Sequence, residues 1–262
     1  MKKLLYLILF TCLNAPLFSQ QANAQQMFTY TTYHKLKPGY TIEDALKLEG
    51  ILKIVHTARK EAGLISGWAV FVPYQWAKTP NVDFDYVTIN WGSIIDKLTD
   101  YPLDLQAELL KKFPQFANIR ADFDKAVSIE RAEYYSRVVS AGELIKPDQI
   151  YLFEVYKATT QNTYDYINLE KKAVIVHEDR IKNGYISHWS FWKREVPTSF
   201  GGYEYFSTIN VLPSLTQLVK GGYTDELAKK ALNMSLPDAY FKTHSLRVGE
   251  SNFLAKMVDG VY

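Results

Sequence analysis

The chain has 262 residues, 30 of them basic and 28 acidic, for a formal net charge of +2, and it contains one cysteine. It has no cluster of Lys and Arg residues, so the charge pattern gives no support to a nucleic-acid or anionic-lipid partner. The composition is 47% hydrophobic, which suits two domains of about 110 to 120 residues, each with its own core.

The first 24 residues are predicted to be an export signal. Two lysines precede an apolar stretch, residues 4–13, that is too short to span a bilayer, and Ala-Asn-Ala at 22–24 has the form of a cleavage site. Cys12 lies inside this segment, so the mature chain would have no disulfide and no thiolate metal site. We expect cleavage after Ala24 and a periplasmic or secreted protein. The alternative is a lipid anchor or a retained signal.

The first part of the mature chain predicts a strand, a helix and four further segments. Residues 28–36 are rich in aromatic and β-branched side chains, which is typical of a strand. Thr41 is predicted to cap a helix, with Asp44 completing a capping box and Gly63 ending the helix. Strands are expected at 65–72, closed by Pro73, and at 84–91 and 130–139, with an interrupted helical stretch at 103–125.

The second part of the chain predicts the same order of elements. We expect strands at 150–156, 186–192, 203–210 and 252–258, and helices at 164–183 and 225–234. Thr224 is the predicted cap of the second helix, and Pro237 is expected to break the chain beyond it. The resulting boundaries are a signal peptide at 1–24, a first repeat at 25–140, a linker at 141–149 and a second repeat at 150–262.

An internal repeat supports this division. Residues 48–68 align with residues 169–189 without a gap, and ten of the 21 positions are identical. The copies begin about 120 residues apart, so each copy has the size of a domain. The identical pairs are Leu48/Leu169, Glu49/Glu170, Ile54/Ile175, Val55/Val176, His56/His177, Arg59/Arg180, Gly63/Gly184, Ile65/Ile186, Ser66/Ser187 and Trp68/Trp189.

The order βαββαβ in each copy predicts an α+β fold made of two tandem ferredoxin-like units. Such a unit has one sheet face covered by helices and one face left open. Trp68, Val70 and Tyr86 are too apolar to remain exposed together, so we expect the two copies to shield these faces against each other.

The duplicated order, with a long first helix ending near Gly63 and Gly184, resembles the dimeric α/β-barrel superfamily. That group includes NIPSNAP-like proteins, antibiotic-biosynthesis-type monooxygenases, haem-degrading monooxygenases, stress-responsive barrel proteins and some lyases. The resemblance implies an intrachain pseudo-dimeric α/β barrel with pockets between sheet and helices. Haem-degrading relatives use an Asn, Trp and His set, and although Asn90 and Asn210 supply the first of these, the order and strand positions do not match.

A polar trio in the first helix of each copy is the main candidate for chemistry. Its side chains are predicted to line the border of the buried helix face, where His could act as a base or as a haem or metal ligand and Arg could hold a carboxylate. The alternative is that each trio ties its helix to the sheet. Glu and His seven residues apart lie about 10 Å apart along the axis, too far to chelate one ion easily, so no metal site is expected. The candidate ligand-binding residues are Glu49, His56, Arg59 and Glu170, and the candidate catalytic residues are His177 and Arg180.

Differences between the copies point to the second copy as the functional one. His188, Ser190 and Trp192 alternate along one strand and share a face that suits a flat ligand or sugar rings, with Tyr203 nearby. Asn210, in the Thr-Ile-Asn triplet that also contains Asn90, completes the predicted ligand-binding set. The alternative is that these aromatic side chains fill the barrel. His34 is expected to be solvated.

Four functions remain open at this stage. The first is binding of a small-molecule or oligosaccharide ligand in a pocket between helix and sheet. The others are a structural module without a ligand, a cofactor-free or haem-linked monooxygenase, and a polysaccharide lyase. The cofactor is left unassigned. We expect no nucleic-acid partner and no membrane span, and we allow for a homo-oligomer.

Overall fold

The computed structural model describes residues 26–143, 148–198 and 201–262. Eight described strands close into one barrel in the order β1-β3-β2-β8-β5-β7-β6-β4, and every neighbouring pair is antiparallel. The predicted signal peptide (1–24) and part of the predicted linker (141–149) lie outside the described residues. An α+β fold with a closed barrel formed within one chain is therefore confirmed.

Each half of the chain contributes four strands. Those of the first half are β1 (Phe28–Leu36), β2 (Gly67–Lys78), β3 (Tyr86–Gly92) and β4 (Val127–Gly142). Those of the second half are β5 (Ile150–Thr159), β6 (His188–Val196), β7 (Tyr203–Leu212) and β8 (Val248–Val261). Within each half the last strand pairs with the first, the first with the third and the third with the second.

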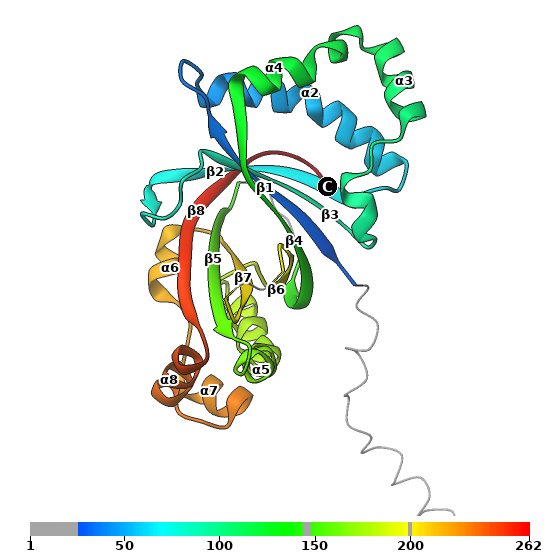
Figure 1. Ribbon diagram of the computed structural model, residues 1–262. Helices are drawn as coiled ribbons and strands as arrows, with labels where there is room; N and C mark the ends of the chain where they lie inside the picture. Colours follow the sequence, from blue (N-terminus) through cyan, green and yellow to red (C-terminus); the bar gives the residue numbers. More distant parts are fainter. Residues whose placement is uncertain (1–25, 144–147, 199–200) are drawn as a thin grey trace, which may run out of the picture.

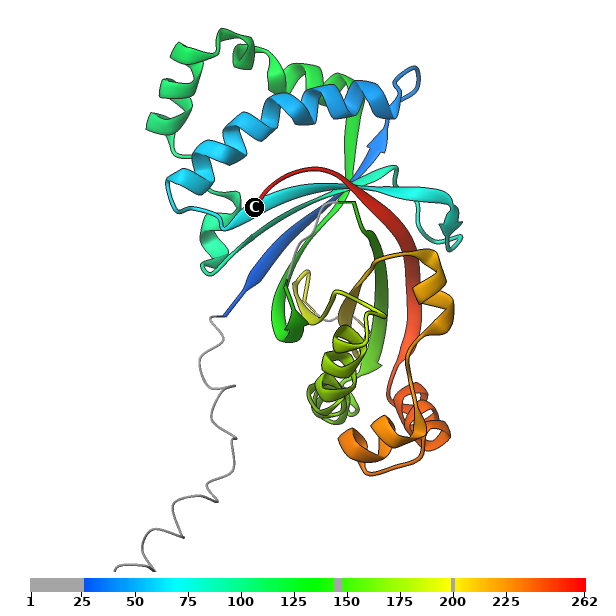
Figure 2. The ribbon, with the colours of Figure 1, turned by 180° about the vertical axis from the view of Figure 1, so that it is seen from behind.

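The helices lie outside the barrel, those of the first half on one side and those of the second half on the other (Figure 1). The first half has α2 (Ile42–Glu61), η1 (Ile95–Thr99), α3 (Leu103–Lys112), η2 (Pro114–Ala117) and α4 (Ile119–Ala126). The second half has α5 (Thr163–Lys182), α6 (Leu215–Lys220), α7 (Asp225–Leu232) and α8 (Leu236–Leu246). The view from behind shows the same separation (Figure 2).

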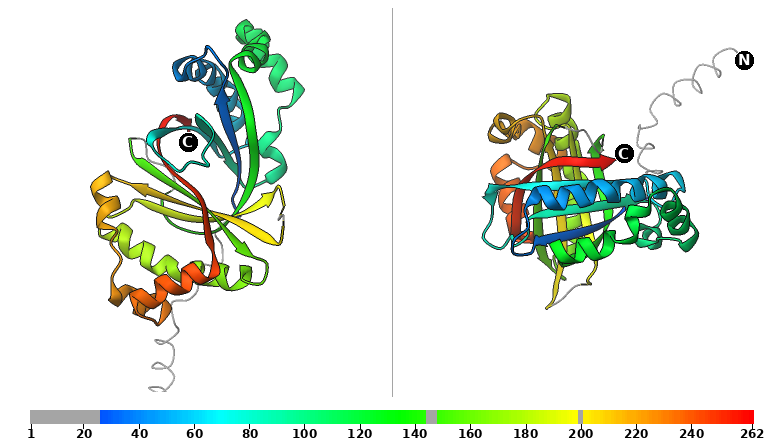
Figure 3. Two further views of the ribbon diagram at one scale, coloured as in Figure 1. Left: turned by 60° about the vertical axis from the view of Figure 1, so that its left-hand side comes forward. Right: turned by 90° about the horizontal axis from the view of Figure 1, so that it is seen from above.

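The two longest strands join the halves. The 14 residues of β8 pair with β5 at one end and with β2 at the other, and the 16 residues of β4 pair with both β1 and β6. Figure 3 shows β8 running from the second half to the strands beneath α2. Both halves therefore depend on each other for edge hydrogen bonds, because an open half would leave two strand edges unpaired.

The inside of the barrel is a core built from both halves. Buried side chains from β2 and β3, including Phe71 and Ile89, pack with Tyr151 and Phe153 of β5 and Phe253 of β8. The rings of Phe153 and Phe253 are stacked with centroids 4.8 Å apart. Aromatic side chains of this size fill an eight-stranded barrel and hold the two halves together.

The prediction that the apolar face containing Trp68 packs against the other half was wrong, because this face lies beneath α2. Trp68, Val70 and Tyr86 pack beneath α2 with Ala45, on the outside of the barrel, rather than against the second half. The residues between them on the same strands, such as Ala69 and Phe71, point inward instead. Both faces of these strands are apolar, so alternation along the strand did not distinguish the inner face from the outer one.

Several local predictions agree with the structure. Thr41 and Asp44 form the capping box of α2, and the Oγ1 of Thr224 accepts a hydrogen bond from Leu227 at the start of α7. Gly63 and Gly184 follow the two long helices with φ angles of +71° and +72°. These left-handed angles carry no steric penalty for glycine, so the helices end where the sequence indicated.

Other boundaries differ from the prediction. Pro73 does not close a strand: β2 continues to Lys78, and its pairing with β8 is irregular after Pro73 because proline has no N–H to donate. The predicted linker begins inside β4, which runs to Gly142. Pro237 lies in the first turn of α8, where its missing N–H is harmless, so it begins a helix rather than breaking the chain.

Candidate functional site

The polar trios lie on the barrel-facing side of the long helices. Glu170, His177 and Arg180 on α5 are all buried, as are their counterparts Glu49, His56 and Arg59 on α2. The helix faces that touch the barrel therefore carry charged and polar groups where apolar residues would be usual. Buried groups of this kind need hydrogen-bond partners, and for the His and Arg of each trio both halves supply them in nearly the same way.

In the second half the trio is extended by a tryptophan and an asparagine. The His177 ring stacks on Trp189, with centroids 4.0 Å apart and planes 5° apart. Arg180 Nη1 lies 2.9 Å from His177 Nδ1 and donates to Asn210 Oδ1 over 3.3 Å and to the Tyr223 hydroxyl over 2.7 Å. Two hydrogens on Nη1 serve three acceptors, so the long contact with Asn210 is the weakest of the three.

The first half repeats this arrangement. His56 stacks on Trp68 with centroids 4.6 Å apart, and Arg59 Nη1 lies 3.1 Å from His56 Nδ1 and 3.3 Å from Asn90 Oδ1. In addition, Arg59 donates to three backbone carbonyls, those of Lys97, Leu98 and Asp100, over 2.7 to 3.1 Å. Arg180 donates to one carbonyl, that of Gly221, over 2.8 Å.

A tyrosine completes each cluster and was not predicted. The Arg59 guanidinium lies 4.1 Å from the ring centroid of Tyr101, and that of Arg180 lies 4.2 Å from Tyr223. The two tyrosines are 122 positions apart, in segments whose remaining sequences do not align, so the internal repeat gave no signal for them. The shared His, Trp, Arg, Asn and Tyr contacts fasten a helix and the following loop to the barrel in both halves.

Both histidines are held neutral with a fixed tautomer. Burial, with the nearby Arg59 charge, lowers the pKa of His56 to about 3, and burial with Arg180 lowers the pKa of His177 well below its ordinary value of 6.5. A guanidinium can only donate, so Nδ1 must be the acceptor and Nε2 must carry the proton. His177 therefore offers an N–H, with no free lone pair at Nε2 for a base or a metal ligand.

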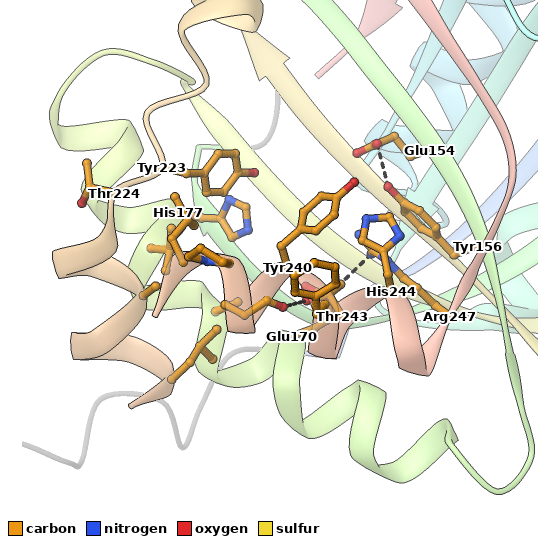
Figure 4. Close-up of a pocket in the computed structure, with 18 residues that line it drawn as sticks. Glu154, Tyr156, Glu170, His177, Tyr223, Thr224, Tyr240, Thr243, His244 and Arg247 are labelled. Atoms are coloured by element: carbon orange, nitrogen blue, oxygen red, sulfur yellow. Dashed lines mark hydrogen bonds and ion pairs between the residues drawn. The ribbon is translucent and has the colours of Figure 1, made fainter. Parts of the chain in front are cut away.

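A large pocket lies beside the trio of the second half. It has a volume of 790 Å³ and is enclosed by the outer face of β5, by α5 and by the α7–α8 segment (Figure 4). Its lining residues are Glu154, Tyr156, Glu170, Ala173, Val176, His177, Tyr223, Thr224, Ala228, Leu232, Leu236, Pro237, Ala239, Tyr240, Phe241, Thr243, His244 and Arg247. Of the predicted residues, Glu170 and His177 line it, whereas Arg180 stands behind His177 and Tyr223.

Two carboxylates in the pocket wall are already engaged. Glu154 accepts hydrogen bonds from Tyr156 over 2.6 Å, from Thr208 over 3.0 Å and from Asn210 over 3.3 Å. Glu170 forms an ion pair with Arg247 at 2.9 Å. Burial raises the pKa of Glu170, and the Arg247 charge opposes this shift.

The register shows which of these groups belong to the second half alone. Thr208 faces Glu154 on β5, whereas Thr88 faces Thr32 on β1. Phe206 faces Tyr156 on β5, and the equivalent pair in the first half is Tyr86 facing His34 on β1. The Tyr86 hydroxyl donates to Glu49 over 2.9 Å, and without that tyrosine Glu170 pairs with Arg247. Comparison of the two copies strand by strand could have found Glu154 and Tyr156, but Arg247 required the fold.

The remaining predicted residues lie elsewhere. His188 and Trp192 do not line the pocket between helix and sheet; they point into the barrel, beside a cavity of 40 Å³ that also touches Ser190. That space holds about one water molecule and no flat ligand. The interpretation that aromatic side chains fill the barrel fits this placement. Tyr203 is 36% exposed at the start of β7, and Asn210 lies beneath the pocket against Arg180 and Glu154.

Two other histidines lie in places that the sequence did not indicate. His34 was predicted to be solvated, but it is 4% exposed, stacks on Tyr86 at 4.4 Å and lies 2.9 Å from the Thr88 hydroxyl. Burial lowers the pKa of His34 to about 3. His244, which the sequence did not place, lines the large pocket with its ring 4.2 Å from that of Tyr240.

Within the ranges that the structure describes, no three His, Cys, Asp or Glu side chains gather as a metal site would need. None of the helices described above is both long enough and apolar enough to cross a membrane.

Comparisons with known proteins identify the fold. No family model matches the chain, and no curated protein matches it in sequence. An anthrone oxidase-like protein shares 12% identity with a TM-score of 0.52, covering 90% of this chain and 93% of that one. A candidate chlorite dismutase shares 12% with a TM-score of 0.51, covering 89% and 95%. A candidate monooxygenase from Fusobacterium nucleatum subsp. nucleatum shares 8% with a TM-score of 0.51, covering 90% and 94%. These likenesses show a shared fold, the closed α+β barrel.

Proposed function

We propose that this protein binds a flat, largely aromatic small molecule in the pocket between α5, α7, α8 and β5. The observation that carries the proposal is the 790 Å³ cavity beside His177, a volume typical of small-molecule sites. Its walls combine apolar side chains such as Val176 and Leu232 with the rings of Tyr156, Tyr240 and Phe241. Rings of this kind stack on planar ligands, and the polar groups between them fix orientation.

Oxidation of the bound molecule is a second candidate function. The anthrone oxidase-like protein and the candidate monooxygenase share the fold and suggest this class of reaction. What favours it in this chain is the neutral N–H of His177 at the pocket wall. A neutral imidazole can stabilise an oxygen that becomes negative during reaction, as an electrophile rather than as a base.

The haem-linked version of this function does not fit His177. An iron ligand needs an unprotonated nitrogen, and Arg180 already uses the lone pair of Nδ1 while Nε2 carries the proton. His244 is the other imidazole in the pocket, and a haem version would have to use it. Addition of haem to the wild type and to His244→Ala tests this version, because a Soret shift that depends on His244 would support it.

The two remaining alternatives are less well supported. A structural module without a ligand would not need the 790 Å³ cavity, since side chains could fill it as they fill the barrel. A lyase that neutralises a uronate carboxylate with Arg180 would need that side chain at the pocket surface. Arg180 is 4% exposed and reaches the pocket only through His177 and Tyr223.

A pair of substitutions tests the binding proposal. Ala173→Trp places a large ring in the pocket, and the aligned position in the first half offers the matched control Leu52→Trp. Calorimetry with a panel of planar aromatic molecules should give binding to the wild type and the control and at least a tenfold loss in Ala173→Trp. Equal binding to all three proteins would place the ligand elsewhere, and the absence of binding across the panel would count against an aromatic ligand.

We also propose that the chain is a tandem duplication of ferredoxin-like units, at 25–140 and 150–262, made as an exported precursor. The ten identities, the equal strand order of the halves and the repeated His–Trp and Arg–His contacts support the duplication. Export through a cleaved signal predicts Gln25 as the first residue of the mature protein, which N-terminal sequencing of extracellular or periplasmic material would check. Sedimentation would test for a homo-oligomer.

A further inference from the structure

We infer that His177 Nε2–H and the Tyr223 hydroxyl form a subsite for a single oxygen anion, so that the ligand is a phenol or enol bound as its anion. This inference rests on the proposed function, because it specifies the chemistry of a ligand in the same pocket. It depends on the direction in which each hydrogen bond around Arg180 must run.

The first donor is fixed by Arg180. Nη1 of Arg180 can only donate, so His177 Nδ1, 2.9 Å away, accepts and the proton of the neutral ring resides on Nε2. Trp189 lies flat against the ring at 4.0 Å and prevents it from turning. Among the described residues Nε2 has no hydrogen-bond partner, and His177 lines the pocket, so this N–H is available to a ligand.

The second donor is fixed by the same guanidinium. The Tyr223 oxygen accepts from Arg180 Nη1 over 2.7 Å, and its own proton is given to no other side chain that the structure describes. The ring planes of Tyr223 and His177 are 87° apart with centroids separated by 6.2 Å. Figure 4 shows the hydroxyl directed toward the space between the labelled residues rather than toward the helix. Two neutral donors, each hydrogen-bonded to Arg180, thus belong to the wall of one pocket.

A positive charge lies directly behind both donors. Each is hydrogen-bonded to the Arg180 guanidinium, and hydrogen bonds that polarise one another in this way strengthen the outer donor. An oxygen anion that accepts from His177 and Tyr223 would be separated from the Arg180 guanidinium only by these two side chains. Arg180 would keep its hydrogen bonds to both of them. Backing of this kind favours an anion over the neutral hydroxyl.

The other charged groups around the pocket act in both directions: Glu154 and Glu170 oppose an anion beside Tyr223, whereas Arg180 and Arg247 favour one. The carboxylates of Glu154 and Glu170 are engaged by three hydrogen bonds and by the Arg247 ion pair, respectively. Arg247 lines the same pocket, and its buried Nε–H has no hydrogen-bond acceptor within the described chain. The titratable and charged groups that face the pocket are Glu154 and Tyr156 from β5, Glu170 and His177 from α5, Tyr223 before α7, Tyr240 and His244 from α8, and Arg247 before β8.

The shape of the site favours a phenol over an aliphatic acid. The pocket that carries the two donors is also lined by apolar and aromatic side chains, including Val176 and Phe241, which would contact the ring that bears the oxygen. On binding, the phenol O–H bond breaks, its proton passes to solvent, and the anion accepts hydrogen bonds from His177 and Tyr223. No oxidant or other reactant is needed for this step.

The test measures the ionisation of a bound probe, 7-hydroxycoumarin, whose phenol and phenolate absorb at different wavelengths. With the full mature protein we expect the anion to bind roughly tenfold more tightly than the neutral phenol, which lowers the apparent pKa of the bound probe by about one unit. Tyr223→Phe keeps the ring over Arg180 but removes one donor, so most of this shift should disappear. The matched control Tyr101→Phe, in the first half, should leave the shift unchanged.

A second probe separates this inference from the function on which it rests. 7-Methoxycoumarin has the same ring but cannot ionise, so it should bind the wild type and Tyr223→Phe with equal, weaker affinity. If neither coumarin binds, the proposed aromatic pocket fails and the inference fails with it. If both bind and 7-hydroxycoumarin stays neutral, or if Tyr223→Phe keeps the full shift, only the anion subsite is overturned.

Discussion

Replacing each buried arginine by methionine should have unequal effects on stability, although the two residues occupy equivalent positions. Methionine keeps much of the apolar stem and removes the guanidinium. Arg59 donates to the carbonyls of Lys97, Leu98 and Asp100, whereas Arg180 donates to that of Gly221 alone. Arg59→Met therefore leaves two more backbone carbonyls without a donor. Arg180→Met in turn leaves the Tyr223 hydroxyl without its donor. At about 1 kcal/mol for each orphaned acceptor, Arg59→Met should therefore cost about 1 kcal/mol more than Arg180→Met.

Urea unfolding followed by tryptophan fluorescence would measure this difference, since Trp68 and Trp189 stack on the histidines that the arginines hold. The barrel is closed by strands from both halves, so we expect a single transition whose midpoint shifts while its slope stays constant. Equal losses for the two variants, or a larger loss for Arg180→Met, would refute the argument that backbone carbonyls set the cost.

Three further outcomes are expected. Burial raises the pKa of Glu49 to about 7 from an ordinary 4.5. Between these two pH values the folded state retains a proton that the unfolded chain releases, so this group lowers the stability of the fold as the pH rises from 4.5 to 7. Glu49→Gln, which still accepts from Tyr86, should need more urea to unfold than wild type at pH 8 and about the same at pH 4; an unchanged difference across that range would contradict the shift. Gly67→Ala should unfold at a temperature at least 10 °C lower than wild type in calorimetry, because the added Cβ would collide with the Trp91 ring. The control Gly50→Ala on α2 adds a Cβ that meets no atom within 4 Å, and it should stabilise the protein by about 0.5 to 1 kcal/mol. The first half expressed alone exposes the edges of β2 and β4, so sedimentation should find a dimer or aggregate, and a stable folded monomer would show that the halves are independent.

Much of the local structure was predictable because its signals lie within a few residues of one another. Thr41 and Asp44 meet across one helical turn, and Gly63 and Gly184 supply the left-handed backbone that ends a helix. The ten identities between the copies added the equivalence of the halves, which in turn placed His177 on the side of a helix that faces the sheet. None of these inferences required knowledge of which strands pair.

The assembly of the site depended on contacts that the sequence does not order. Arg247 and Glu170 are 77 positions apart and meet only because β8 returns beside β5 and brings α8 over α5. When both faces of a strand are apolar, contacts with distant parts of the chain decide which face points into the barrel. For this reason the sequence placed Trp68 against the wrong half and His188 in the wrong cavity. Alternation fixes which residues share a face, but barrel closure and helix packing decide what each face meets.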